Sequence, residues 1–120
     1  MAVSEITSGG GTLTAAIGTE HVLVSTTTAG VYQLVVDTRN MVNGDVLELR
    51  CYLAVRSGES RYLTRIQRYR NTQGDGAADT GGDGEVIVFS IPFTSPFGIR
   101  FSLKQTLGTG RSYIWSVWQQ

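Results

Sequence analysis

The strictest constraint in this sequence is a run of alternating side chains between residues 45 and 55. Its apolar row consists of Leu47, Leu49, Cys51, Leu53 and Val55, and its other row carries Glu48, Arg50 and Tyr52. Side chains alternate between the two faces of a β-strand, whereas a helix would scatter these apolar residues around its axis. The run therefore predicts a strand with one apolar face, which a second layer of structure must cover.

Shorter runs of the same kind recur along the chain and predict further strands. They are rich in β-branched and aromatic residues, and the chain holds 15 glycines but only two prolines. This composition is typical of many short strands joined by tight turns. The pattern therefore predicts about eight strands and almost no helix. We therefore expect an all-β protein, an antiparallel β-sandwich of jelly-roll or Greek-key type, with a closed barrel as the alternative.

The length of 120 residues is that of one domain. Residues 1–11 end in the run SGGG and hold few side chains that could be buried, so we expect a flexible N-terminal arm. Residues 12–120 would then form a single β-sandwich domain. The Gly- and Asp-rich segment 74–84 is expected to be a solvated loop within it.

Side chains that catalysis and metal binding require are sparse. His21 is the only histidine and Cys51 the only cysteine, and no motif places a serine nucleophile beside His21. We expect a protein that is not an enzyme and has no catalytic residues, no metal site and no cofactor. The formal net charge of zero disfavours a nucleic-acid partner, and no apolar run approaches the ~18 to 20 residues of a membrane span.

The basic residues are concentrated in one part of the chain. Six of the ten lie between residues 50 and 70, and all six are arginines interleaved with tyrosines. Segment 61–70 has mixed polarity on both faces, which is typical of an edge strand or of a strand whose outer face meets a partner. Arg and Tyr are enriched at protein interfaces. The alternative is a solvated sheet face whose arginines pair with Glu48 and Glu59. We predict a protein-facing surface formed by Arg50, Arg56, Arg61, Tyr62, Arg65, Arg68, Tyr69 and Arg70.

Two stretches carry a resemblance to a known family. Residues 29–50, AGVYQLVVDTRNMVNGDVLELR, and residues 101–115, FSLKQTLGTGRSYIW, resemble small virion structural proteins of tailed bacteriophages, of the head decoration or cement type. The similarity extends over most of residues 12–118 and is weaker between Arg61 and Gly84. It implies a β-rich dimer or trimer that binds the major capsid protein on the outside of the shell. It also implies a protein made in the bacterial cytoplasm and located on the virion, with no catalytic residues to transfer.

A second class of function fits the same composition. A carbohydrate-binding or receptor-binding β-sandwich of a phage tail would also have few chemically reactive groups. Exposed aromatic side chains, for instance Tyr52 and Trp118, would stack on sugar rings in such a module. A glycan array, or a saccharide titration followed by tryptophan fluorescence, would distinguish the two hypotheses.

Overall fold

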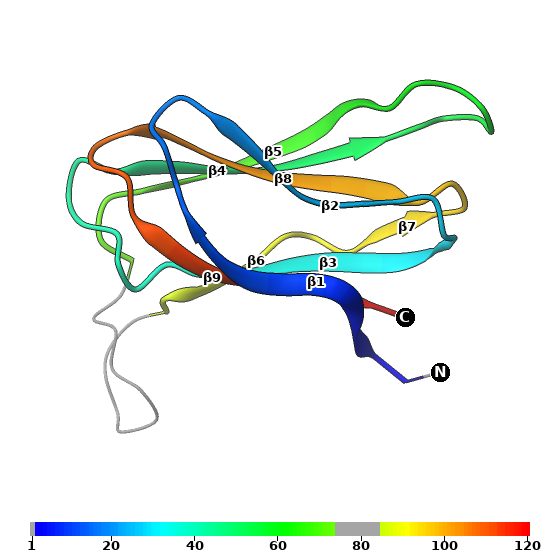
Figure 1. Ribbon diagram of the computed structural model, residues 1–120, viewed down its shortest axis with the longest axis horizontal. Coiled ribbons are helices and arrows are strands. Elements are labelled where there is room, and N and C mark those ends of the chain that lie inside the picture. The colour runs from blue at the N-terminus through cyan, green and yellow to red at the C-terminus, as the bar shows by residue number, and fades with distance from the viewer. Residues whose placement is uncertain (1, 74–84) are drawn as a thin grey trace.

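The computed structural model describes residues 2–73 and 85–120, and within these residues the chain is built from β-strands in two layers (Figure 1). The strands are β1 (Ser4–Thr14), β2 (Glu20–Thr26), β3 (Gly30–Asp37), β4 (Val46–Leu53), β5 (Tyr62–Arg70), β6 (Ile87–Phe89), β7 (Phe93–Ser95), β8 (Ile99–Leu107) and β9 (Ser112–Gln119). Sheet A has the order β1-β9-β3-β6, with β7 also paired to β3, and sheet B has the order β2-β8-β4-β5.

The connectivity confirms the predicted antiparallel sandwich of jelly-roll type. Every strand pair is antiparallel. The chain crosses from one sheet to the other between β1 and β2, β2 and β3, β3 and β4, β5 and β6, β7 and β8, and β8 and β9. The described residues contain one strand more than the eight expected, because the stretch that bends at Pro92 forms two short strands, β6 and β7, which share the position beside β3.

The core lies between the two sheets and contains the apolar row of β4. Leu47, Leu49 and Cys51 are buried there, as the alternation predicts, and Leu53 packs partly against the core. Val55 does not belong to this row, because the strand ends at Leu53 and the Val55 side chain is 90% exposed. The inward rows of β3, β8 and β9 complete the core, and their fully buried members include Tyr32, Leu34, Phe101, Leu103, Tyr113 and Val117.

The expected N-terminal arm differs from the structure. Ser4–Thr14 forms β1, which pairs with β9 at Ser4 and Glu5 and again from Gly10 to Thr14, with a register shift between the two parts. The glycine run indicates flexibility when it is considered alone. A glycine nevertheless offers the same backbone donor and acceptor to a neighbouring strand as any other residue does. Most of the segment predicted to be an arm is therefore an edge strand of sheet A.

The turn between β8 and β9 is fixed by side chains that reach across it. Gln105 accepts a hydrogen bond from the Arg111 backbone at 3.1 Å and another from the Tyr113 hydroxyl at 2.9 Å. Arg111 forms an ion pair of 2.9 Å with Asp45, which is almost fully buried. This segment crosses between the two sheets.

Among the described residues, no helix is long and apolar enough to cross a membrane.

Candidate functional site

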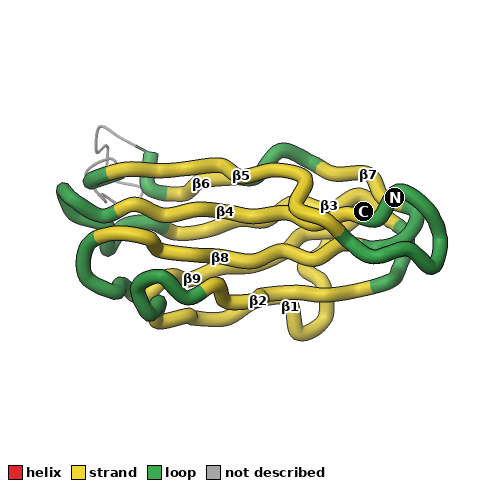
Figure 2. Tube along the Cα trace, turned by 90° about the horizontal axis from the view of Figure 1, so that it is seen from above, coloured by secondary structure: helices red, strands yellow, loops and turns green. Residues whose placement is uncertain are grey.

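The Arg- and Tyr-rich segment forms β5, an edge strand of sheet B, as its mixed polarity predicts (Figure 2). One side of β5 pairs with β4 from Tyr62 to Arg70. Ile66, Arg68 and Arg70 share the outer face of sheet B with Glu48 and Arg50, because residues opposite each other in an antiparallel pair point to the same face. The structure divides the eight predicted interface residues into three groups.

Arg50 and Arg68 form the first group, because both pair with Glu48 on the outer face of sheet B. Glu48 is 5% exposed, and its two oxygens lie 2.8 Å from Arg50 Nη2 and 2.8 Å from Arg68 Nε. Arg50 also reaches Glu20 of β2 at 2.8 Å. Burial alone would raise the pKa of Glu48, but the hydrogen bonds and charges of Arg50 and Arg68 lower it below its ordinary value. For these two arginines the solvated-face alternative describes the free protein better than an open interface does.

Tyr52 belongs to the same network and is not an exposed aromatic platform. It is buried, its hydroxyl donates to Glu20, and the Arg100 guanidinium lies 4.1 Å from the centroid of its ring. The expectation that Tyr52 could stack on a sugar is therefore wrong. A cation covers one face of the ring, and burial leaves little of the rest accessible.

The second group consists of Arg61, Tyr62 and Tyr69, whose surroundings differ from one another. Arg61 donates to the Ser25 hydroxyl at 2.9 Å and to the Thr26 carbonyl, so it joins the start of β5 to β2. Tyr69 faces inward and packs partly against the core, and burial raises the pKa of its hydroxyl. Tyr62 is 73% exposed. Of these three side chains, only Tyr62 is open to a partner as predicted.

Arg56, Arg65 and Arg70 form the third group. All three are exposed, and within the described ranges none has a side-chain hydrogen bond or ion pair. Arg65 lies opposite Cys51 and Arg70 opposite Val46, so the two point to opposite faces of β5. The open part of the predicted surface therefore consists of these three arginines and Tyr62, at and beside the free edge of sheet B.

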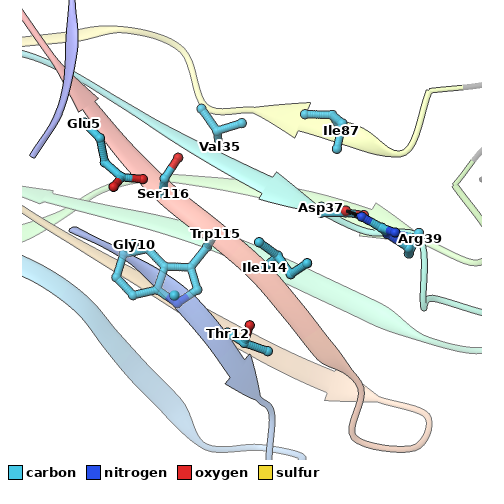
Figure 3. A pocket seen from close by; sticks show the side chains of 11 residues that line it. Glu5, Gly10, Thr12, Val35, Asp37, Arg39, Ile87, Ile114, Trp115 and Ser116 are labelled. Atoms are coloured by element: carbon cyan, nitrogen blue, oxygen red, sulfur yellow. Dashed lines mark hydrogen bonds and ion pairs between the residues drawn. The ribbon is translucent and has the colours of Figure 1, made fainter. Parts of the chain in front are cut away.

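Sequence reasoning missed a second feature, a hollow on the outer face of sheet A (Figure 3). The hollow encloses about 450 Å³ and is lined by β1, β3, β6 and β9. Its apolar lining includes Val35, which is buried, and Ile87 and Ile114, which are exposed. Phe89 and Trp118 meet edge to face nearby, with ring centroids 5.8 Å apart. The apolar side chains of this outer face therefore come from three separate strands, β3, β6 and β9.

The charged groups of the hollow lie at its two ends. Glu5 of β1 is exposed, pairs in register with Trp118, and has no polar side-chain partner within the described ranges. At the other end, Arg39 binds Asp37 through Nε at 2.8 Å and through a second guanidinium nitrogen. Burial alone would raise the pKa of Asp37, but the hydrogen bonds of Arg39 lower it below its ordinary value.

The alternation of β9 is the signal that could have revealed this face. Ile114, Ser116 and Trp118 form its outward row, and an outward row with two large apolar side chains is unusual for a solvated sheet face. The contribution of β6 was harder to foresee, because the stretch Glu85–Ile91 reads as a strand buried on both sides. In the structure only Val88 of β6 is buried, while Ile87 and Phe89 are exposed.

Comparison with known proteins adds one similarity. No family model matches the chain, and no curated protein matches it. Among solved structures, the chain is similar to one described as the structure of infectious bursal disease virus Gx strain, with 20% identity and a TM-score of 0.45. The match covers 98% of this chain but 32% of that one, so the chain spans about a third of its length. A likeness at this level says nothing about function.

Proposed function

We propose that the protein is a non-enzymatic structural component of a bacteriophage virion, a decoration or cement protein that binds the outside of the capsid shell. Two observations support the proposal: the sequence resemblance of residues 29–50 and 101–115, and the open edge strand β5. The second carries the most weight. Arg56, Arg65 and Arg70 are exposed without partners among the described residues, so their guanidinium donors are available to another surface.

The chemistry of these side chains indicates the partner. Guanidinium groups make planar, two-pronged hydrogen bonds with carboxylates, and such pairs are short and directional. Tyr62 adds a large aromatic surface with few rotatable bonds. An acidic surface on the major capsid protein fits this combination. The free protein itself would be a dimer or a trimer.

Charge reversal tests the proposal. Arg65→Glu and Arg70→Glu each remove one unpaired arginine, so both should preserve the circular dichroism spectrum and the unfolding temperature. Binding to purified shells that lack this protein should fall about tenfold for each, because a loss of ~1.4 kcal/mol is a tenfold change and one charge-assisted hydrogen bond contributes about that much. Ala16→Glu combined with Ile17→Glu is the matched control, since both residues are exposed in the turn between β1 and β2 and together they shift the net charge by the same two units. Equal losses in all three variants, or no loss in any, would contradict the role of β5.

The alternative, a carbohydrate- or receptor-binding module of a phage tail, keeps Trp118 as its one exposed candidate from the sequence. Trp118 pairs in register with Glu5, whose carboxylate has no polar side-chain partner among the described residues and would be available to sugar hydroxyls. This alternative predicts that saccharide titration changes the tryptophan fluorescence, and that Trp118→Ala abolishes the change. Decoration of the shell predicts no saccharide response.

A further inference from the structure

We infer that the outer face of sheet A is a two-fold interface between two copies of this chain, in which Glu5 of each copy pairs with Arg39 of the other. The inference rests on the proposed function only where that function includes self-association. It adds the surface, the symmetry and the residue pair. It does not use β5, so binding to the shell and contact between copies can be tested separately.

The first argument is the composition of this face. Ile87, Phe89, Ile114 and Trp118 are all at least 36% exposed, and they belong to β6 and β9, which pair with the two sides of β3. Exposed apolar side chains elsewhere in the described chain include Val22 and Leu107 on separate strands of sheet B and Val42 in the loop between β3 and β4. A contiguous apolar face rimmed by polar groups marks an interaction site.

The second argument is the placement of charge. Glu5 lies at one end of the hollow, and Arg39 lies beside Ile114 at the other end (Figure 3). Glu5 pairs in register with Trp118. Ile114 and Trp118 are four residues apart on β9, so the two ends are separated by ~13 Å at the usual rise of a strand. The negative end and the positive end thus lie on either side of an apolar centre.

Such a face is complementary to itself. Consider a two-fold axis that lies in the plane of contact and runs perpendicular to the line from Glu5 to Arg39. Rotation about it turns a second copy face to face with the first and exchanges the two ends. Glu5 of each copy then lies opposite Arg39 of the other, so this pair forms twice in the dimer. Ile114 of each copy lies opposite Trp118 of the other. An interface of this kind is closed, so it produces a dimer and no fibre.

Arg39 has the donors that this arrangement needs. The Nε and one terminal nitrogen of Arg39 bind Asp37, and the Arg39 side chain remains 57% exposed. A guanidinium group has five N–H donors, so the remaining ones can bind Glu5 of the second copy while Asp37 stays in place. In the dimer, Ile114 and Trp118 would partly exclude water from the ion pair between Glu5 and Arg39. Such an ion pair is stronger than one on an open surface.

The apolar centre is tested by Ile114→Asp. Sedimentation velocity should show a dimer for the wild-type protein at micromolar concentration, and the variant should raise the dimer dissociation constant at least about tenfold, because an unpaired carboxylate would be buried in the contact. Val22→Asp is the matched control, since Val22 is similarly exposed on sheet B. A wild-type protein that is monomeric at ~100 μM, or a dimer that Ile114→Asp does not weaken, overturns the inference.

The charge pair is tested by two single variants and their mixture. Glu5→Arg alone places two arginines opposite each other, and Arg39→Glu alone places two glutamates opposite each other, so each should dimerise about tenfold more weakly than the wild type. In an equimolar mixture, heterodimers keep one Glu5–Arg39 pair and have the charges exchanged in the other, so opposite charges meet at both positions. The dissociation constant of the mixture should return to within about twofold of the wild-type value. A mixture that associates no better than its components overturns the pairing. Thermal unfolding of each variant checks that the loss of the Asp37 partner has not unfolded the chain.

The same variants separate this inference from the proposed function. Ile114→Asp should leave the effect of Arg65→Glu on shell binding unchanged. If Ile114→Asp abolishes shell binding and leaves the mass of the free protein unaltered, the face binds the shell and not a second copy. If the protein dimerises through sheet A but does not bind shells, the decoration function fails and the interface stands.

Discussion

Replacing Glu48 with glutamine should destabilise the protein by about 2 kcal/mol. Glu48 is 5% exposed and binds two arginines. Breaking a buried ion pair by removing one partner costs about 3–5 kcal/mol. Two features of the structure reduce this cost: Arg50 keeps its second contact with Glu20, and Arg68 can return to water. At this chain length, a loss of about 2 kcal/mol corresponds to a fall in Tm of about 6–10 °C.

A double-mutant cycle divides this loss between the two arginines. The side chain of Arg50 is 17% exposed and that of Arg68 is 52% exposed. Exposed ion pairs contribute only about 0.2–1 kcal/mol because solvent screens them. The coupling of Glu48 with Arg50→Met should therefore be about 1–2 kcal/mol, and that with Arg68→Met well below 1 kcal/mol.

Urea unfolding with an unchanged slope provides the measurement, and Glu59→Gln, on an exposed loop, serves as the control. A loss below about 0.5 kcal/mol for Glu48→Gln would refute the view that this network holds the outer face of sheet B together. So would a larger coupling for Arg68 than for Arg50, since the exposed fractions would then not determine the strength of the pairs.

Three further predictions follow from other parts of the molecule. Burial raises the pKa of the Cys51 thiol to about 12, so at pH 8 a thiol reagent should label it only as fast as the protein unfolds, and labelling within minutes without urea would contradict its inward position. Gly98→Ala should cost about 2–4 kcal/mol, because the residue has φ of 79° and its new Cβ would lie 1.9 Å from the Thr26 carbonyl oxygen; Gly58→Ala, with φ of 78° and open space around it, should cost about 1 kcal/mol. Stability should fall with acid below about pH 4. In Glu20, Asp37, Asp45 and Glu48, hydrogen bonds and ion pairs outweigh burial and lower the folded-state pKa below the unfolded one, so the stability they contribute is complete above the unfolded pKa and disappears as the pH falls through the folded pKa. Urea midpoints that stay constant from pH 7 to pH 3 would contradict this.

The alternation of β4 was enough to predict the strand and its buried row. Leu47, Leu49 and Cys51 follow a strict period of two, and a one-residue shift would have placed the charges of Glu48 and Arg50 in the core. The pattern failed at Val55, because alternation continues in the sequence after the strand has ended. Nothing in a two-residue period marks the point where the pairing with β8 stops.

The outer faces were harder to predict, because they depend on residues that are distant in the sequence. Tyr52 looks exposed in its own strand, but Glu20 and Arg100 come from β2 and β8 to cover it. The hollow of sheet A likewise combines Glu5 with Arg39 and Ile87. A single strand predicts its own inward and outward rows, but the sheet order decides which outward rows become neighbours.

The segment 61–70 shows what composition can and cannot predict about a surface. Its mixed faces correctly predicted an edge strand. The same composition could not distinguish Arg68, which pairs with Glu48, from Arg65 and Arg70, which have no partner among the described residues. That distinction depends on the register between β4 and β5, which places Arg68 directly opposite Glu48. The Gly- and Asp-rich segment 74–84 lies outside the described residues.

The position of β9 within sheet A also has a consequence for how the protein is made. β9 lies between β1 and β3, and it pairs Leu13 with Tyr113 and Leu34 with Val117. Sheet A therefore cannot form its centre until β9 has left the ribosome, and until then the apolar rows of β1 and β3 stay uncovered. Pairings between such distant segments are slow to form. The domain therefore closes only once β9 is available, and a chain that stops short of Ser112 would leave β1 without its neighbour and the core of the sandwich open on one side.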